Sequence, residues 1–257
     1  MLVDTHCHLD AAEFDGDRDA VAEAATRAGV GLIVVPSVER SNFGAVASVC
    51  RDYSCCVAAY GIHPMYVERA VDADLDALRE TVQREHPLAV GEIGLDHFVE
   101  PRDDLRQEFY FTAQLKIARE AGLPVLLHVR RAIDPVLKQL RLCPVPGGIA
   151  HAFNGSRQQA DEFIKLGFKL GFGGAMSFPR ASRIRELAAT LPIDAIVLET
   201  DAPDIPPEWR VGARNTPDQL PRMAQVLADL RGISLQEVAE ATTANAIAVL
   251  PGLSRIH

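Results

Sequence analysis

Short apolar runs alternate with amphipathic stretches along almost the whole chain. Runs such as residues 31–36 and 195–199 are too short for helices and predict buried β-strands. The stretches between the runs repeat apolar residues every three or four positions, which is typical of helices with one buried face. For the longest of these helices, at residues 103–121, the spacing predicts a buried face made of Leu105, Phe109, Thr112, Leu115 and Ala118.

This alternation is regular enough to predict a fold. Strands are expected at residues 2–3, 31–36, 55–60, 88–92, 124–128, 149–151, 168–172 and 195–199. Helices are expected at residues 17–28, 41–52, 73–84, 103–121, 134–142, 157–166, 182–190, 217–230 and 234–250. Strand–helix units in series predict a parallel sheet covered by helices. At 257 residues the best fit is an α/β protein with a (β/α)8 TIM barrel, a single domain over residues 1–257, and a doubly wound open sheet is the alternative.

Composition narrows the class of protein. Hydrophobic residues make up 48% of the chain, but no apolar run approaches the roughly 20 residues that cross a bilayer. Asp4 and His6 interrupt the N-terminal apolar run, so we expect no secretory signal. The protein is therefore predicted to be cytoplasmic, without a membrane partner, and monomeric or weakly oligomeric.

Charge and cysteine content exclude further classes. The net charge of −9 argues against broad non-specific affinity for nucleic acid, so a nucleic-acid substrate would need a local basic patch or metal ions. The five cysteines show no CxxC spacing, which argues against a disulfide framework and against a zinc knuckle. We expect them to be buried free thiols.

Residues that can bind metal recur where the predicted strands end. His6 and His8 lie two residues apart after the first strand, so both side chains point to one face. A parallel barrel brings the carboxyl ends of all its strands to one rim. The candidates at that rim are His6, His8, His63, Glu92, His128, His151 and Asp201.

These residue types indicate a metal centre. Imidazole nitrogens and carboxylates suit Zn2+ or Mn2+, whereas Mg2+ and Ca2+ sites are usually richer in oxygen. The set contains more ligands than one tetrahedral ion can bind if that ion also keeps a position open for water. Two ions that share a bridging carboxylate would bind all of them. Such a pair holds a hydroxide and clamps both oxygens of a phosphodiester displacement. We predict two divalent ions, Zn2+, Mg2+ or Mn2+.

An ordered set of motifs resembles the TatD family of metal-dependent deoxyribonucleases and hydrolases, which are amidohydrolase-like TIM barrels. Each motif is weak alone, but together they span nearly the whole chain. The motifs are His6-Cys7-His8, Gly61-Ile62-His63-Pro64, Gly91-Glu92-Ile93-Gly94-Leu95-Asp96, Leu123-Pro124-Val125-Leu126-Leu127-His128, His151-Ala152-Phe153-Asn154-Gly155-Ser156, Glu199-Thr200-Asp201-Ala202-Pro203, Arg214-Asn215-Thr216-Pro217 and Thr243-Ala244-Asn245-Ala246.

The resemblance implies a binuclear site with catalytic residues Asp201, Glu92 and His63. Asp201 is the candidate base, because a carboxylate beside a metal-bound water can accept its proton. His63 is implied to lie near the substrate rather than on the metals, where it would contact a phosphate or donate a proton. The implied ligands are His6, His8 and Asp201 for one ion, His128 and His151 for the other, and Glu92 as the bridge.

Other residues on the predicted rim are candidates for contact with substrate. The segment from Asn154 to Arg157 opens a predicted helix whose N–H groups favour an anion, although Asn154 or Ser156 could simply cap that helix. Arg180 could contact phosphate or remain solvated. The full set of predicted substrate-binding residues is His63, Arg130, Asn154, Ser156, Arg157 and Arg214.

Two aromatic positions have open interpretations. His97 stands where the family commonly has a tyrosine, and we expect it to fill that position rather than reach the site. Trp209 could stack on a nucleic-acid base or simply pack.

The leading hypothesis is a metal-dependent phosphodiesterase: a deoxyribonuclease acting 3′ to 5′ on single-stranded DNA. The alternative is an amidohydrolase-type deacylase or cyclic-amide hydrolase acting on a small molecule or tRNA, because metal-activated hydroxide serves both chemistries. Glu92 stands where many amidohydrolases use a modified lysine, which favours the first hypothesis. A third hypothesis is a non-catalytic metal-binding scaffold. It predicts a fully coordinated site without a spare carboxylate, and Asp201 and His63 argue against it.

Overall fold

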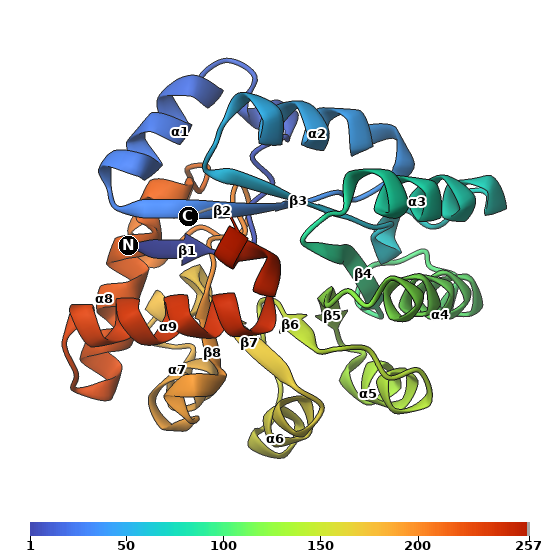
Figure 1. The fold of residues 1–257 in the computed structure, drawn as a ribbon. Helices are drawn as coiled ribbons and strands as arrows, with labels where there is room; N and C mark the ends of the chain where they lie inside the picture. Colours follow the sequence, from blue (N-terminus) through green and yellow to red (C-terminus); the bar gives the residue numbers. More distant parts are fainter. Residues whose placement is uncertain (256–257) are drawn as a thin grey trace.

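The computed structural model describes residues 1–255 and contains an eight-stranded parallel sheet in sequential order (Figure 1). The strands are β1 (Leu2–Asp4), β2 (Val30–Pro36), β3 (Cys56–Tyr60), β4 (Ala89–Asp96), β5 (Val125–Arg130), β6 (Gly148–Ala150), β7 (Phe168–Phe172) and β8 (Ile196–Leu198). Backbone pairing of Cys7 with Ala202, just past β1 and β8, joins the two edges into a nearly closed barrel. The predicted TIM barrel is confirmed, and the open sheet is not observed.

Helices follow the strands and surround them (Figure 1). They are α1 (Arg18–Arg27), α2 (Phe43–Asp52), α3 (Asp72–Glu85), α4 (Asp104–Ala121), α5 (Ile133–Leu142), α6 (Arg157–Lys165), α7 (Ser182–Thr190), α8 (Leu220–Arg231) and α9 (Leu235–Val249). Among residues 1–255, none of these helices has the length and apolar character needed to cross a bilayer.

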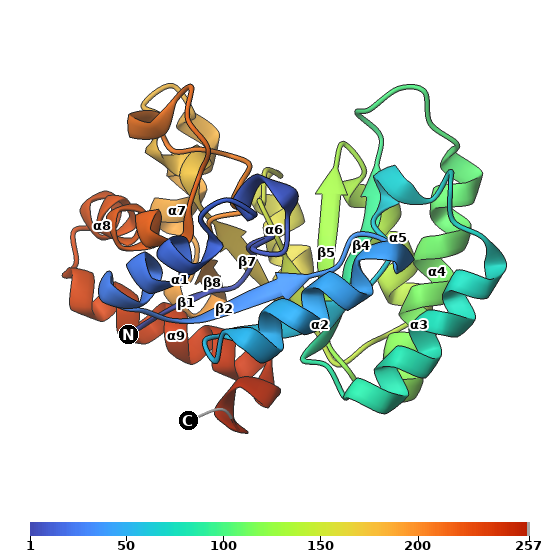
Figure 2. The ribbon, with the colours of Figure 1, turned by 90° about the horizontal axis from the view of Figure 1, so that it is seen from above.

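Alternate strand residues face the barrel interior and the helices. In β2, Leu32 and Val34 belong to an interior apolar cluster, whereas Ile33 and Val35 pack in the larger cluster beneath the helices. The interior cluster includes the end of α9, which lies beside β1 and β8 (Figure 2). Its members are Val3, Leu32, Val34, Ala59, Leu88, Ala89, Leu126, Ile149, Val197, Ala246, Val249, Leu250 and Leu253. These residues fill the amino-terminal end of the barrel, so the polar interior is confined to the carboxyl end.

Helix α4 buries a different face from the one predicted. Leu115 and Ala118 are buried, but Leu105 and Phe109 are 81% and 50% exposed, and Thr112 is half-buried. The inward face includes the glutamines at 107 and 114. Each accepts a hydrogen bond from a strand-end peptide N–H and donates one to the carbonyl of the same residue. The prediction was right for Leu115 and Ala118 and wrong for the first turns of the helix, because the helix uses polar side chains there to satisfy buried backbone groups, which a hydropathy pattern does not reveal.

Candidate metal centre

The seven metal-binding candidates converge at the carboxyl end of the barrel. Three overlapping triads each have potential ligand atoms within 4.8 Å of one another. The triads are His6, Glu92 and His151; His6, His8 and Asp201; and His63, Glu92 and His128. Residues separated by almost two hundred positions therefore form one cluster, because every strand delivers its end to the same rim.

An irregularity in β4 directs Glu92 into the barrel. The pairing of β4 with β5 shifts register between Val90 and Ile93. Both of these residues pack in the apolar cluster beneath the helices although they are three positions apart, and a regular strand would point them to opposite sides. The strand therefore holds one extra residue between them, as a β-bulge does. Glu92 is consequently only 2% exposed and lies at the centre of the histidines. The sequence predicted a strand that ends at residue 92, whereas β4 continues to Asp96.

The two carboxylate oxygens of Glu92 face different histidines. Oε2 lies 3.1 Å from Nε2 of His6 and 3.5 Å from Nε2 of His8. Oε1 lies 3.0 Å from Nδ1 of His128 and 2.9 Å from Nε2 of His151. Glu92 therefore stands between two groups of nitrogen donors, as a bridging carboxylate would.

Asp201 completes the group around Oε2. Its Oδ1 lies 3.6 Å from Nε2 of His6 and 3.7 Å from Nε2 of His8. Its backbone adopts φ 56°, an uncommon conformation for a residue other than glycine, and its N–H donates to the carbonyl of His6 at 2.8 Å. The side chains of Asp201 and His8 are 12% and 16% exposed, so water can reach this side of the cluster.

His63 lies near the centre of the cluster and not on its outer rim. Its Nε2 is 3.4 Å from Oε1 of Glu92, and its ring centroid is 4.2 Å from that of His128. Nδ1 accepts a hydrogen bond from the N–H of Met65 at 3.1 Å, so a neutral His63 carries its proton on Nε2. This tautomer can donate a hydrogen bond toward the space between the metal-binding residues.

The spacing of the donors fits metal ions. Nδ1 of His128 and Nε2 of His151 lie 3.4 Å apart, and both face Oε1 of Glu92. Zinc binds imidazole nitrogen at about 2.0–2.1 Å, so two nitrogens of a tetrahedral site are expected roughly 3.4 Å apart. Imidazole and carboxylate are also the ligand types that divalent transition ions accept.

The charges in this cluster shift the pKa of its members. Burial opposes the charge on Glu92, but the neighbouring histidines, led by His63 and His151, hold the pKa of Glu92 well below its usual range. Burial, helped by the charge of His151, lowers the pKa of His6 to about 3. At neutral pH Glu92 is thus an anionic carboxylate and His6 a neutral imidazole, the protonation states in which these two residues bind metal. Against the effect of burial, the Glu92 carboxylate raises the pKa of His151 to about 10, so His151 must lose a proton to bind an ion.

Asp96 orients His128, a role that the sequence analysis did not assign. Oδ2 of Asp96 accepts a hydrogen bond from Nε2 of His128 at 2.9 Å, and Oδ1 accepts from the N–H groups of Phe98 and Val99. This arrangement leaves the lone pair of His128 Nδ1 facing Glu92. A signal existed in the sequence, because Asp96 lies an even number of positions after Glu92 on a strand.

We expect Asp96→Asn to weaken metal retention by about 10- to 100-fold, because loss of a carboxylate behind a ligating histidine has an effect of this size. The fold should persist, since asparagine keeps an acceptor for the two backbone N–H groups. Metal content after graded chelation, measured beside the exposed control Asp161→Asn, tests this expectation. Equal retention in the two variants would contradict the role of Asp96.

Glu199 supports the opposite side of the centre. Its Oε1 lies 3.9 Å from Nδ1 of His151 and accepts a hydrogen bond from the N–H of Ala152. Gly171 makes room for it, because a Cβ at that position would collide with the Glu199 carboxylate. Like Asp96, Glu199 was part of a motif but had no assigned role, since its partner comes from another strand.

Four predicted substrate contacts are engaged in local structure. Arg157 pairs with Asp161 at 3.0 Å, and Arg214 pairs with Asp17 at 2.7 Å. The Asn154 side chain accepts from an arginine of α7 at 2.8 Å, and Ser156 caps α6. Capping by Ser156 was one of its two predicted interpretations.

Arg130 differs from these residues. Its guanidinium lies 3.7 Å from the ring centroid of Phe98, and that of Arg131 lies 4.5 Å from the same ring. Within residues 1–255, neither arginine has a carboxylate at ion-pair distance. Arg130 ends β5, two residues after His128, so it lies on the rim of the metal centre with its charge available.

The remaining rim candidates lie outside the metal-binding triads. The Nε1 of Trp209 donates to Gln219 at 3.0 Å, and Arg222 stacks on its ring at 4.1 Å, so Trp209 has packing partners. Nε2 of His97 lies 4.0 Å from a carboxylate oxygen of Asp104. Arg180 lies 5.7 Å from the ring centroid of the phenylalanine at 178.

Comparison with known proteins shows similarity along the whole barrel. A family profile described as TatD related DNase matches residues 3–251. The chain is 42% identical over 247 residues to the uncharacterized metal-dependent hydrolase YjjV of Escherichia coli K12, with 95% of each chain covered. It is 33% identical over 270 residues to human deoxyribonuclease TATDN3, with coverage of 99% of this chain and 96% of the human protein.

The similarity extends to three dimensions. The crystal structure of YjjV from Escherichia coli K12 matches this chain with a TM-score of 0.93 and 40% sequence identity. The match covers 97% of this chain and 98% of the YjjV chain. Sequence and structure therefore agree on the same group of relatives.

Proposed function

The chain belongs to the TatD family of metal-dependent hydrolases, and from that premise we propose that it hydrolyses phosphodiester bonds in DNA with two divalent ions. The observation that carries the proposal is the position of Glu92, whose two oxygens face separate groups of histidines. A single ion would leave one of these groups unused. His6, His8 and Asp201 would hold one ion, His128 and His151 the other, and Glu92 would bridge them.

The chain's own residues have distinct tasks in this proposal. When bound, Zn2+, Mg2+ or Mn2+ would polarise the attacking water and neutralise charge on the phosphate. Asp201 lies on the solvent-accessible side of the cluster, where its carboxylate accepts the proton of that water. His63 directs its Nε2 proton toward the side of the cluster that holds Oε1 of Glu92 and His128, where it donates to a phosphate oxygen or to the leaving group.

DNA is the substrate that the relatives favour, because the human relative is named a deoxyribonuclease. Arg130 and Arg131 supply positive charge at the rim, and Phe98, which is 42% exposed between them, offers a face on which a base can stack. This combination of aromatic ring and guanidinium suits an unpaired strand. We therefore retain the 3′ to 5′ degradation of single-stranded DNA as the specific activity, and a monomer or weak oligomer as its form.

The test is hydrolysis by metal-free protein resupplied with Mg2+, Mn2+ or Zn2+. End-labelled single-stranded DNA and bis(p-nitrophenyl) phosphate serve as the two substrates. We expect metal-dependent cleavage of both, with a ladder of products that shorten from the 3′ end. Cleavage of neither substrate by protein that holds two ions would instead favour amide or carboxylic ester substrates, which the same donor set could serve.

A further inference from the structure

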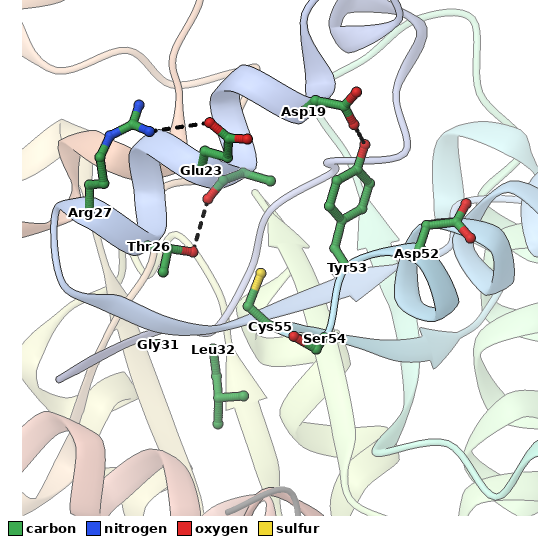
Figure 3. Close-up of a pocket in the computed structure, with 11 residues that line it drawn as sticks. Asp19, Glu23, Thr26, Arg27, Gly31, Leu32, Asp52, Tyr53, Ser54 and Cys55 are labelled. Carbon is green, nitrogen blue, oxygen red and sulfur yellow. Dashed lines mark hydrogen bonds and ion pairs between the residues drawn. The ribbon is translucent and has the colours of Figure 1, made fainter.

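A cavity lies away from the metal centre, between α1 and the amino-terminal ends of β2 and β3 (Figure 3). Its volume is about 670 Å3, within the range of about 300–1,000 Å3 that is typical of small-molecule sites. The metal-binding residues lie at the opposite, carboxyl ends of the strands. The lining residues that matter here are Asp19, Glu23, Arg27, Tyr53 and Cys55.

Most polar groups in this cavity already have partners. Arg27 pairs with Glu23 at 3.2 Å, and the Tyr53 hydroxyl donates a hydrogen bond to Asp19. Figure 3 shows these pairs along the wall and the sulfur of Cys55 pointing into the space between α1 and Tyr53. The thiol is thus the reactive group that the cavity presents.

Cys55 is one half of a thiol pair. Its Sγ lies 3.9 Å from Sγ of Cys56, the first residue of β3. Cys55 is half-buried and lines the cavity, whereas Cys56 is buried behind it and does not line the cavity. Adjacent strand residues normally point to opposite faces, but Cys55 precedes the strand and its side chain turns to the same side.

The pair shares its protons unequally. The hydrogen bond from Cys56, assisted by Thr26 and opposed by burial, lowers the pKa of the Cys55 thiol to about 7. The same hydrogen bond, together with burial, raises the pKa of Cys56 far above its usual range. Cys55 is therefore the thiol of the pair that ionises more readily, and the thiolate is the form that attacks electrophiles and binds metals.

We propose that Cys55 and Cys56 form a chelating dithiol site for a thiophilic metal or metalloid ion, whose remaining ligand occupies the adjacent cavity. A tetrahedral ion with sulfur bonds of about 2.3 Å holds two sulfurs roughly 3.8 Å apart, close to the observed 3.9 Å. Soft thiolate ligands select soft ions over the ions preferred by imidazole and carboxylate. The dithiol and the metal centre would thus bind different classes of ion.

Phenylarsine oxide is the probe that tests this site, because trivalent arsenic joins two neighbouring thiols. Two As–S bonds form, the arsenic–oxygen bond is lost, and the two thiol protons leave with the oxygen as one water. No electron is transferred. The freshly reduced, metal-loaded full chain is titrated at neutral pH, and intact mass together with peptide mapping reports how much arsenical is bound and where.

We expect one arsenical per chain, bound across Cys55 and Cys56. Cys55→Ala and Cys56→Ala should each weaken binding on the order of 100-fold or more, because a single thiol loses the benefit of two linked bonds. Cys143→Ala is the matched control, since it removes another buried thiol from the end of α5. It should bind as the wild type does.

Two results would overturn the site: a folded, reduced wild-type chain that binds no arsenical, or binding that persists in Cys55→Ala. If Cys56→Ala fails to fold, as circular dichroism would show, Cys55→Ala decides alone, because the Cys55 side chain is only half-buried. Bound mass is measured without any substrate. The outcome is therefore independent of the phosphodiesterase proposal.

Discussion

The Asp201→Asn variant should keep its fold and most of its metal while hydrolysis falls by about 10²- to 10⁴-fold, the usual contribution of a positioned general base. Asparagine preserves the shape of the side chain, and the N–H of residue 201 can still donate to the carbonyl of His6. It lacks the negative charge that accepts the proton of the attacking water. The measurement is kcat for bis(p-nitrophenyl) phosphate at saturating metal.

The matched control is Asp161→Asn, which removes an exposed carboxylate of α6 that pairs with Arg157. It should hydrolyse the substrate at the wild-type rate. Metal content and thermal unfolding of both variants establish that any loss of rate is not a loss of ions or of fold. Near wild-type turnover in Asp201→Asn would remove that residue from its assigned role.

Glu92→Ala should have an equally large effect, but through metal content. The Glu92 carboxylate contacts both groups of histidines, so its loss deprives each ion of a ligand and removes the negative charge that compensates the ions in this buried site. We expect purified Glu92→Ala to hold fewer than two ions per chain and to show little hydrolysis. Elemental analysis of protein dialysed against a weak chelator measures the first quantity.

The control for Glu92 is Glu162→Ala, which removes a half-buried glutamate on α6 that pairs with Lys165 and Arg141. It should retain the wild-type complement of ions. Two ions per chain in Glu92→Ala would contradict a bridging carboxylate. Restoration of activity at high metal concentration would agree with lost affinity rather than lost fold.

The local pattern was sufficient to predict the barrel and the convergence of candidate metal-binding residues at one end of it. Short apolar runs have the length of strands, and the residues after them, such as His128 and His151, have the side chains of metal ligands. Parallel strands in a barrel all end on one rim, so the order of elements alone brings these residues together. Sequential positions also explain why His6 and His8 share a face.

Other features depended on contacts between distant segments. The inward direction of Glu92 requires the register shift of β4 against β5, and a single strand does not reveal its neighbour's register. The same limit applies to Gln107 in α4, which is buried because a strand-end peptide group needs its amide. The buried face predicted from hydropathy did not include that position.

The substrate-facing rim shows the same division. The sequence predicted the same role, contact with a phosphate, for Arg130 and Arg214. In the structure Arg214 is paired with Asp17, whereas Arg130 stacks on Phe98 and its charge is available to a substrate. Only the folded chain selects between them, because the partner of a surface charge is set by which loops meet.

Strand period and strand order, which are local properties, thus predicted the fold class and brought the candidate metal-binding residues to one rim, and the ordered motifs predicted the family. The tertiary structure alone decided which groups orient those residues, including Asp96 behind His128, and that the thiol of Cys55, 3.9 Å from that of Cys56, lines a cavity. The physical reason is that hydrogen bonds between elements, strand register and cavities depend on which segments lie next to each other in space. The order of residues along the chain does not show these spatial neighbours.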